Sequence, residues 1–267
     1  MTKLIAGITL VFLSWNTAAD GIGTYSEGLR MGQLTDFSEK GLLRSGEGEL
    51  LIGNASTVLK VPYTYQCGSE KEPETCVGER TINPWKFSVD LSNKDLVQQL
   101  KNAKGKYVVL KYKHSMIQNP FANDTNYVIT GVEEVQKSES PAEPCQAGHA
   151  GSGRRADGNS TGRIVKVSQQ GLWNKSWEIE MQVGDSGNEF TYMSVRDQDM
   201  AKCMMDYLKT GTKVSLDYNQ SYFHNPLGRR TTFDVLQVAP VEQPAAVNPT
   251  VGSENATHDD ATATAGR

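Results

Sequence analysis

Sulfur-bearing side chains that could hold a soft metal ion gather late in the chain. The group consists of Met193, Met200, Cys203, Met204 and Met205. Thioether and thiolate sulfurs are the ligands that Cu(I) prefers, so this group allows a copper site. The same spacing places an apolar stripe on one face of a helix, and methionine packs well in irregular cores. Core packing is the favoured interpretation, and copper binding is kept as the alternative.

Other residue types that bind metals or catalyse reactions are sparse. Cys145 and His149 could chelate an ion, but a zinc site needs three or four protein ligands. Hydrolysis needs a nucleophile, a base and an orienting group that converge, and no such set is visible. His114 and His224 occupy different positions in two similar segments, and neither stands out as a base. No catalytic residue, metal or cofactor is predicted, and the chain is not expected to be an enzyme.

Two Asn-Pro loops carry the best candidates for binding a partner. The candidate residues are Asn119, Phe121, Tyr222, Phe223, His224, Arg229 and Arg230. Aromatic rings beside amide and guanidinium donors can stack on sugars or pack against a protein. The alternative is that Asn-Pro only builds a turn and the aromatic residues cover the rim of a barrel.

These loops occupy equivalent places in an internal repeat. Phe87-Ser88-Val89 and Met193-Ser194-Val195 are 106 residues apart, as are Asn119-Pro120 and Asn225-Pro226. An earlier segment beginning at Gly32 recurs 130 residues later. Periods near 100 residues indicate two duplicated domains rather than a solenoid.

Each copy shows the same order of elements. In the first copy, strands are expected over 31–37, 47–52, 85–90, 107–113 and 127–135, with a helix over 94–103. In the second copy, strands are expected over 162–167, 177–183, 190–195, 213–218 and 231–238, with a helix ending near Gly211. Three strands, a helix and two strands is the order of an OB-fold. The predicted fold is therefore all-β with one short helix per domain, as tandem OB-like five-stranded barrels; a generic small barrel or sandwich is the alternative.

The two offsets differ by 24 residues, which places an insertion between the second and third strands of the first copy, over 54–84. It contains Cys67, Cys76 and an acidic group, Glu70, Glu72, Glu74 and Glu79. This insertion is either a recognition element or a neutral elaboration. The predicted organisation is a first domain over 20–137, a flexible linker over 138–160, a second domain over 161–241 and a disordered tail over 242–267.

The first nineteen residues have the pattern of a secretory signal. Lys3 precedes an apolar run from Leu4 to Trp15, and Thr17-Ala18-Ala19 offers small residues for cleavage after Ala19. The apolar run is shorter than the ~20 residues that span a bilayer comfortably. A periplasmic or secreted protein without a membrane span in its mature chain is expected, and an uncleaved N-terminal anchor is the alternative.

Charge and cysteine content fit an exported protein. Without residues 1–19 the chain keeps 26 basic and 31 acidic side chains, a formal charge of −5, which disfavours nucleic acid as a partner. Four cysteines allow three pairings, and export favours disulfides. Cys67 and Cys76 lie close in one loop, which leaves Cys145 for Cys203; the alternative is that Cys203 is a buried free thiol.

The start of the first copy resembles a known group of proteins. Tyr25-Ser26-Glu27-Gly28, Arg30 and Gly32 are followed by Phe37-Ser38, Lys40-Gly41 and Glu47-Gly48-Glu49-Leu50. This series is similar to the pattern YS[DE]GxRxG, FSxKG and EGEL of small exported or membrane-anchored bacterial proteins. That group has no established activity, so the resemblance implies envelope location and fold. The leading hypothesis is a non-enzymatic envelope protein that binds a protein or glycan through paired OB-like domains.

Overall fold

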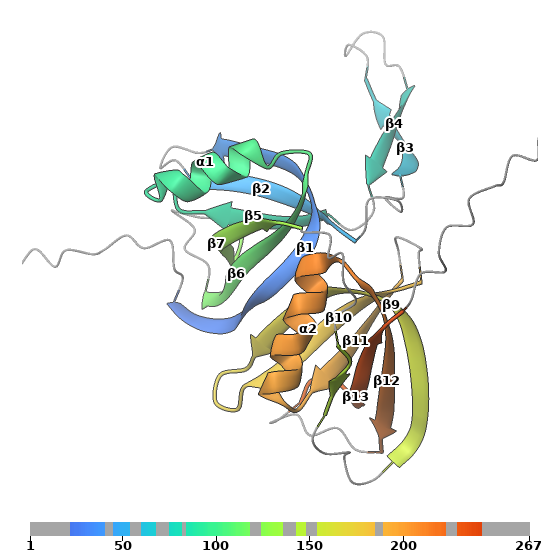
Figure 1. Cartoon of the computed structure of the whole chain (residues 1–267). Coiled ribbons are helices and arrows are strands. Elements are labelled where there is room, and N and C mark those ends of the chain that lie inside the picture. The colour runs from blue at the N-terminus through green and yellow to red at the C-terminus, as the bar shows by residue number, and fades with distance from the viewer. Residues whose placement is uncertain are drawn as a thin grey trace, which may run out of the picture.

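A computed structural model describes residues 22–40, 45–53, 60–67, 75–81, 84–117, 124–135, 143–147, 154–184, 189–222 and 229–241. The described residues form mostly β-strands, together with two helices (Figure 1). The predicted candidates Asn119, Phe121, Phe223 and His224 lie outside these ranges, as do His149 and the segments predicted to be the signal and the tail.

The first half of the chain closes into a ring of five strands. Its elements are β1 (Ile22–Lys40), β2 (Ser45–Ile52), β5 (Pro84–Val89), α1 (Lys94–Asn102), β6 (Tyr107–Ile117) and β7 (Tyr127–Glu134). Neighbours around the ring are β1–β2, β2–β5, β5–β7, β7–β6 and β6–β1, and β5–β7 alone of these pairs is parallel. A closed ring with its helix between the third and fourth strands is the OB-fold arrangement.

The second half repeats this ring. Its elements are β9 (Arg154–Gln170), β10 (Ser176–Val183), β11 (Phe190–Val195), α2 (Gln198–Thr210), β12 (Lys213–Ser221) and β13 (Phe233–Pro240). The pairs are β9–β10, β10–β11, β11–β13, β13–β12 and β12–β9, with β11–β13 parallel. The predicted all-β, OB-like fold class is confirmed. Each ring holds its own hydrophobic core, with α1 or α2 packed against it.

The Met and Cys side chains of α2 that could have bound copper instead pack in the hydrophobic core of the second ring. Met200, Met204 and Tyr207 are buried, and Cys203 packs beside them. Gly211 ends α2 in the left-handed region with φ 65°, and its N–H donates to the carbonyl groups of Tyr207 and Leu208. Only glycine adopts this conformation without strain, which explains why the sequence marks the end of the helix well.

Both predicted disulfides are present. Cys67 pairs with Cys76, and Cys145 pairs with Cys203. The second bond ties α2 to β8 (Cys145–Gln146), a short strand that pairs with β13. The free-thiol alternative for Cys203 is therefore wrong, and copper binding loses its proposed thiolate ligand.

The insertion in the first half contains a hairpin. Strands β3 (Lys60–Gln66) and β4 (Thr75–Thr81) pair antiparallel as a separate two-stranded sheet, and the disulfide between Cys67 and Cys76 closes it. Figure 1 shows this hairpin standing apart from both rings. A two-stranded hairpin alone is marginally stable in water, so the disulfide is the main constraint on its folded form.

Strand β9 begins earlier than the sequence predicts. The sequence predicts a flexible linker up to residue 160, yet residues 154–160 extend β9 along β12, with Arg154 opposite Ser221 and Ser160 opposite Leu216. The expected boundary at residue 161 therefore falls inside a strand. The segment is polar and shows no alternation, so its strand form depends on backbone pairing with β12, which composition does not reveal.

The two rings are joined through one continuous sheet. Strand β1 pairs with β9 from Ser26 opposite Gln170 to Arg30 opposite Lys166. At Gly28 the strands approach so closely that a Cβ atom would lie 2.3 Å from the carbonyl oxygen of Val167. Met31 and Val109 from the first ring are part of the core of the second. The two rings are thus joined both by backbone pairing between β1 and β9 and by apolar packing of first-ring side chains against the core of the second ring.

Candidate ligand-binding face at the ring junction

A buried Glu–Ser–Thr network anchors the loop between the fourth and fifth strands of the first ring. The hydroxyl group of Ser88 donates to Glu47 at 2.9 Å, and the backbone N–H of Asp124 donates to the same carboxylate at 3.2 Å. The N–H of Thr125 donates to the Ser88 oxygen at 3.1 Å. Burial raises the pKa of Glu47 despite these hydrogen bonds.

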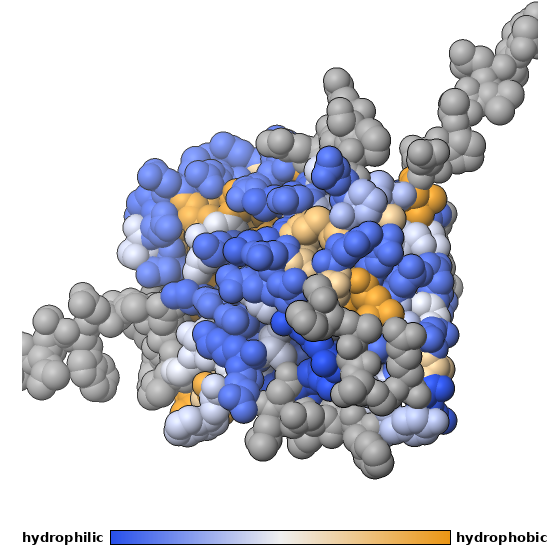
Figure 2. Space-filling view, turned by 60° about the horizontal axis from the view of Figure 1, so that its bottom comes forward, coloured by the Kyte–Doolittle hydropathy of each residue, from blue (hydrophilic) through white to orange (hydrophobic). Residues whose placement is uncertain are grey.

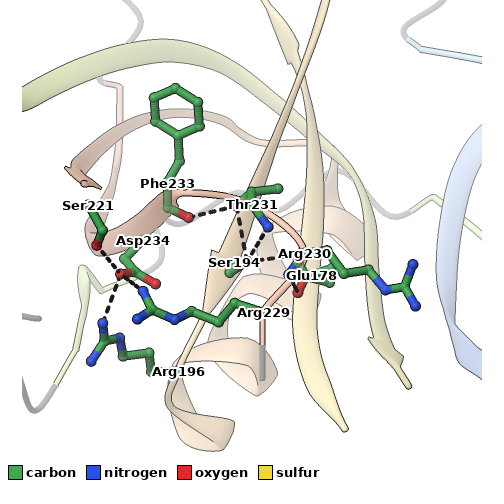
Figure 3. Close-up of polar contacts among 9 residues, drawn as sticks. All are labelled: Glu178, Ser194, Arg196, Ser221, Arg229, Arg230, Thr231, Phe233 and Asp234. Atoms are coloured by element: carbon green, nitrogen blue, oxygen red, sulfur yellow. Dashed lines mark hydrogen bonds and ion pairs between the residues drawn. The ribbon is translucent and has the colours of Figure 1, made fainter. Parts of the chain in front are cut away.

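The second ring carries the same network (Figure 3). Ser194 donates to Glu178 at 2.8 Å, the N–H of Arg230 donates to Glu178 at 3.1 Å, and the N–H of Thr231 donates to Ser194 at 3.3 Å. Burial raises the pKa of Glu178 as it does that of Glu47. Sequence comparison aligned Ser88 with Ser194, but it gave no reason to join them to a glutamate and a threonine.

Arg229, a predicted partner contact, is engaged inside the protein. Its guanidinium group and that of Arg196 both bind the buried Asp234, the latter at 2.9 Å. Figure 3 shows these two guanidinium groups converging on Asp234, whereas the side chain of Arg230 extends away from it. Arg229 therefore fixes the loop, and Arg230 is the arginine that the loop presents.

The Arg230 side chain begins a chain of stacked groups that reaches the first ring. Its guanidinium lies over the ring of Tyr25, 4.5 Å from the centroid. Tyr25 meets His114 edge to face at 5.5 Å, and His114 stacks on Tyr127 at 4.2 Å. Cation–π contacts of this kind contribute about 0.5–2 kcal/mol. Since Tyr127 opens β7, these contacts connect the second ring's loop with the end of the first ring's equivalent loop.

A depression of about 520 Å³ lies beside this chain of contacts. Its lining residues are Phe190, Thr191, Tyr192, Arg230, Thr231, Thr232 and Phe233. Tyr192 is 54% exposed, so its ring is available to a ligand. Strand β11 and the loop before β13 form the walls, which are the third strand and the 4–5 loop of this OB-like ring. OB-folds commonly bind ligands with this loop and the neighbouring sheet face.

A buried ion pair lies under the junction. Arg30 of β1 binds Glu180 of β10, and both side chains are buried. The Arg30 guanidinium lies 5.1 Å from the centroid of Trp85, which meets Tyr112 edge to face at 5.4 Å. Removing one partner of a buried pair leaves an uncompensated charge, at a cost of about 3–5 kcal/mol. The pair therefore fixes the register between β1 and β9 and holds strand β10 of the second ring in place relative to β1.

Lys166 completes this face. It lies directly opposite Arg30 on one side and Glu180 on the other. Burial and then the charge of Arg30 lower the pKa of Lys166 to about 8. Burial and then Lys166 lower the pKa of His114, which is therefore neutral at pH 7.

The structure thus brings Arg230 and Arg229 into one loop but gives them different contacts. Tyr222 follows β12 and is 66% exposed, outside the residues that line the depression. Sequence reasoning missed Tyr25, Tyr192 and Lys166. Tyr192 could have been found as the outward-facing aromatic residue of an alternating strand. Tyr25 and Lys166 meet Arg230 and Arg30, respectively, only because the two rings are paired.

Metal ligands do not gather in the part of the chain that the structure describes. Among those residues there is no group of three or more His, Cys, Asp or Glu side chains placed to hold an ion. Within the same ranges, neither helix has the length and apolar character needed to cross a bilayer. The two disulfides indicate an oxidising compartment outside the cytoplasm.

Comparison with known proteins identifies no function. Residues 23–139 match the model of a family described as a domain of unknown function, DUF8785. A search of curated proteins found no match. Among solved structures, a deletion mutant of the single-stranded DNA binding protein from Thermus aquaticus is similar at 12% identity, over 84% of this chain and 98% of that one, with a TM-score of 0.22. At this TM-score the likeness adds nothing to the strand pairing, and it is the ring topology that identifies the OB-like fold.

Proposed function

We propose that this protein is a non-enzymatic, exported envelope protein of bacteria that binds a glycan in the depression beside Arg230. The lining of that depression carries the proposal. It combines the rings of Phe190, Tyr192 and Phe233 with the Arg230 guanidinium and the hydroxyl groups of neighbouring threonines. Aromatic rings stack on the apolar faces of sugars, while guanidinium and hydroxyl groups hydrogen-bond to sugar oxygens.

The size of the depression favours a glycan over a protein partner. A volume of about 520 Å³ is within the range of ~300–1,000 Å³ found for small-ligand sites. A stable protein interface instead buries about 800 Å² on each partner, with an apolar centre. Figure 2 shows a face of the molecule on which apolar residues gather only in small, separate patches among polar ones.

Export is proposed from two observations. The pattern of residues 1–19 is that of a secretory signal, and both disulfides require an oxidising compartment for their persistence. Nucleic acid is a weaker proposal, because phosphate binding needs a surplus of cations. The whole chain instead has a formal charge of −4.

A binding panel tests this proposal. The purified oxidised protein would be titrated with neutral and acidic oligosaccharides of envelope type and with single-stranded DNA. Saturable oligosaccharide binding that weakens at least tenfold in Tyr192→Ala and stays unchanged in Trp173→Ala is expected. Trp173 is a matched control because it is 95% exposed and does not line the depression. Binding to DNA alone, or to envelope proteins with no oligosaccharide binding, would contradict the proposal.

A further inference from the structure

The side chains that border the depression continue across the junction into the first ring. Arg230 lines the depression, and its guanidinium lies 4.5 Å from the centroid of the Tyr25 ring. Tyr25 contacts His114 edge to face at 5.5 Å. Arg230 belongs to the second ring, whereas Tyr25 and His114 belong to strands β1 and β6 of the first. A ligand that extends past Arg230 in this direction therefore meets side chains of the first ring.

These two aromatic side chains differ in exposure from those of the first core. Trp85 and Tyr112 are buried, but Tyr25 and His114 remain partly exposed. Amphipathic rings of this kind present an apolar surface and a polar group together, which suits them to binding surfaces. Tyr25 and His114 are thus placed to contact a ligand as well as to pack the junction.

His114 is held in position by the side chains behind it. It lies directly opposite Tyr127 in the β6–β7 ladder, and the two rings stack at 4.2 Å with 17° between their planes. Tyr127 in turn meets the buried Trp85 edge to face at 5.1 Å. A side chain that is already fixed loses little conformational freedom when a ligand contacts it, so binding there carries a small entropic cost.

The stacked histidine occurs in the first ring and not in the second. The repeat places Gln220 at the position of His114 and Phe233 at the position of Tyr127. Gln220 lies opposite Phe233 in the β12–β13 ladder, as His114 lies opposite Tyr127. Phe233 lines the depression, so the residue that supports His114 is the first-ring equivalent of a wall of the glycan site.

The first ring does not repeat the depression itself. The position equivalent to Tyr192 is Lys86, an exposed lysine on β5, and the position equivalent to Arg230 is Asp124. These first-ring positions therefore lack the aromatic ring and the guanidinium group that the second ring offers. What the first ring can add to the site comes from strands β1 and β6.

We infer that the glycan site continues from the depression over Arg230 and Tyr25 to His114, so that its ligand is an extended oligosaccharide that contacts both rings at once. This inference rests on the proposed glycan binding, which it makes more specific. A short oligosaccharide held in the depression leaves His114 uncontacted, whereas further sugar units gain contact with the first ring. Contacts along one connected ligand raise its affinity because the later ones form within the complex.

Single-stranded nucleic acid is the competing extended ligand, because bases also stack on aromatic side chains. Such binding combines stacking with a positively charged groove along the backbone. The formal charge of −4 on the chain favours the oligosaccharide.

A series of ligands of increasing length tests this inference. β-1,4-linked oligomers of N-acetylglucosamine and of glucose, from two to six units, would be titrated into the natural protein and into His114→Gln. In the natural protein, affinity for one of the two series should rise at least tenfold with length. In His114→Gln the rise should be lost while the affinity for the disaccharide stays within twofold, since His114 does not line the depression.

Two controls accompany the series. The second ring carries glutamine at the position of His114, so His114→Gln should fold, and its thermal unfolding should match that of the natural protein. Lys86→Gln alters the first-ring equivalent of Tyr192 and should keep the full rise of affinity with length.

The outcomes separate the two proposals. Affinity that does not rise with length, or a rise that persists in His114→Gln, would refute the extended site while glycan binding stands. Loss of disaccharide affinity in His114→Gln would show that His114 only supports the depression, which also overturns the inference. If no oligosaccharide binds, or if a single-stranded oligonucleotide binds more tightly than every oligosaccharide, both proposals fail.

Discussion

At the scale of single residues, the junction is defined by charged groups whose neighbours come from the other ring. Arg30 finds its acid on β10, Lys166 finds a like charge on β1, and Arg230 lies over a tyrosine of β1. None of these contacts is local in sequence, since Arg30 and Glu180 are 150 positions apart. Sequence reasoning could select Arg230 because an exposed arginine beside aromatic residues is a local pattern. It could not select Lys166, because a lysine in a strand has no distinguishing local feature.

The lowered pKa of Lys166 predicts how the unfolding free energy changes with pH. Its pKa is about 8 when folded and ordinarily 10.5, so between these values the unfolded chain binds more protons. The cost of burying the charged lysine is therefore present below pH 8 and disappears as the pH rises to 10.5. Lys166→Met should be more stable than the natural protein at pH 7, by about 1–2 kcal/mol after allowing for partial exposure, and no more stable near pH 10.5.

Denaturant unfolding at pH 7, 9 and 10.5 measures this difference. The exposed Lys86→Met serves as the control, with a difference from the natural protein that does not change with pH. If the difference in unfolding free energy between Lys166→Met and the natural protein were the same at every pH, Lys166 would not be desolvated at the junction.

At the scale of elements, the repeated Glu–Ser–Thr network explains how both rings hold the 4–5 loop. The same three residue types recur with the same donors and acceptors. The backbone N–H that donates to the glutamate belongs to Asp124 in the first ring and to Arg230 in the second. Duplication thus preserved the anchor while the loop diverged. That divergence supports different roles for the two loops.

The network allows a matched pair of substitutions. Ser88→Ala and Ser194→Ala each remove one hydrogen bond from a buried carboxylate and leave a backbone N–H without its acceptor, so each should cost about 1–3 kcal/mol of unfolding free energy. Only Ser194→Ala loosens the loop that carries Arg230. Thermal unfolding should therefore show similar losses, while glycan affinity should fall in Ser194→Ala alone. Equal loss of affinity in both variants would contradict the assignment of the face to the second ring.

Most elements follow from the sequence because their patterns are local. Strands such as 47–52 and 177–183 alternate or are apolar, and Gly211 ends its helix as glycine does. Several features depend on distant pairing and are not predicted, among them residues 22–30 of β1, the first residues of β9, strand β8 and the β3–β4 hairpin. Residues 154–160 are polar and aperiodic and β8 has only two residues, so their extended form depends on the partner strand. Strand β3 does alternate, but its place in a separate hairpin depends on pairing with β4 and on a disulfide.

At the scale of the whole molecule, the two rings behave as one structure because β1 and β9 pair directly. Gly28 makes that pairing possible, as a side chain there would meet the Val167 carbonyl oxygen at 2.3 Å. The sequence showed two similar domains, yet it gave no sign that they share a sheet. The site lies where they join, which explains why its residues could be predicted only in part.

Gly28→Ala should therefore disrupt the junction. Forcing a methyl group between paired strands should cost about 1–3 kcal/mol or more, since the obstacle is backbone that cannot rotate away. Gly131→Ala is the control, because a Cβ atom at Gly131 would meet only the Lys111 Cβ, at an ordinary 3.6 Å. Chemical denaturation should separate the two variants clearly. Equal stability would show that β1 and β9 are not in direct contact in solution.

The central claim is that the depression between β11 and the loop before β13 is where a glycan binds. Its most direct test is the chemical-shift change of backbone amides in the isotope-labelled, oxidised protein as the tightest-binding oligosaccharide is added. The largest changes should fall within 190–192 and 230–233, with smaller ones at Lys166 and Tyr25. Changes confined to the β3–β4 hairpin or to the outer surface of the first ring would contradict it, as would a spectrum that no oligosaccharide alters.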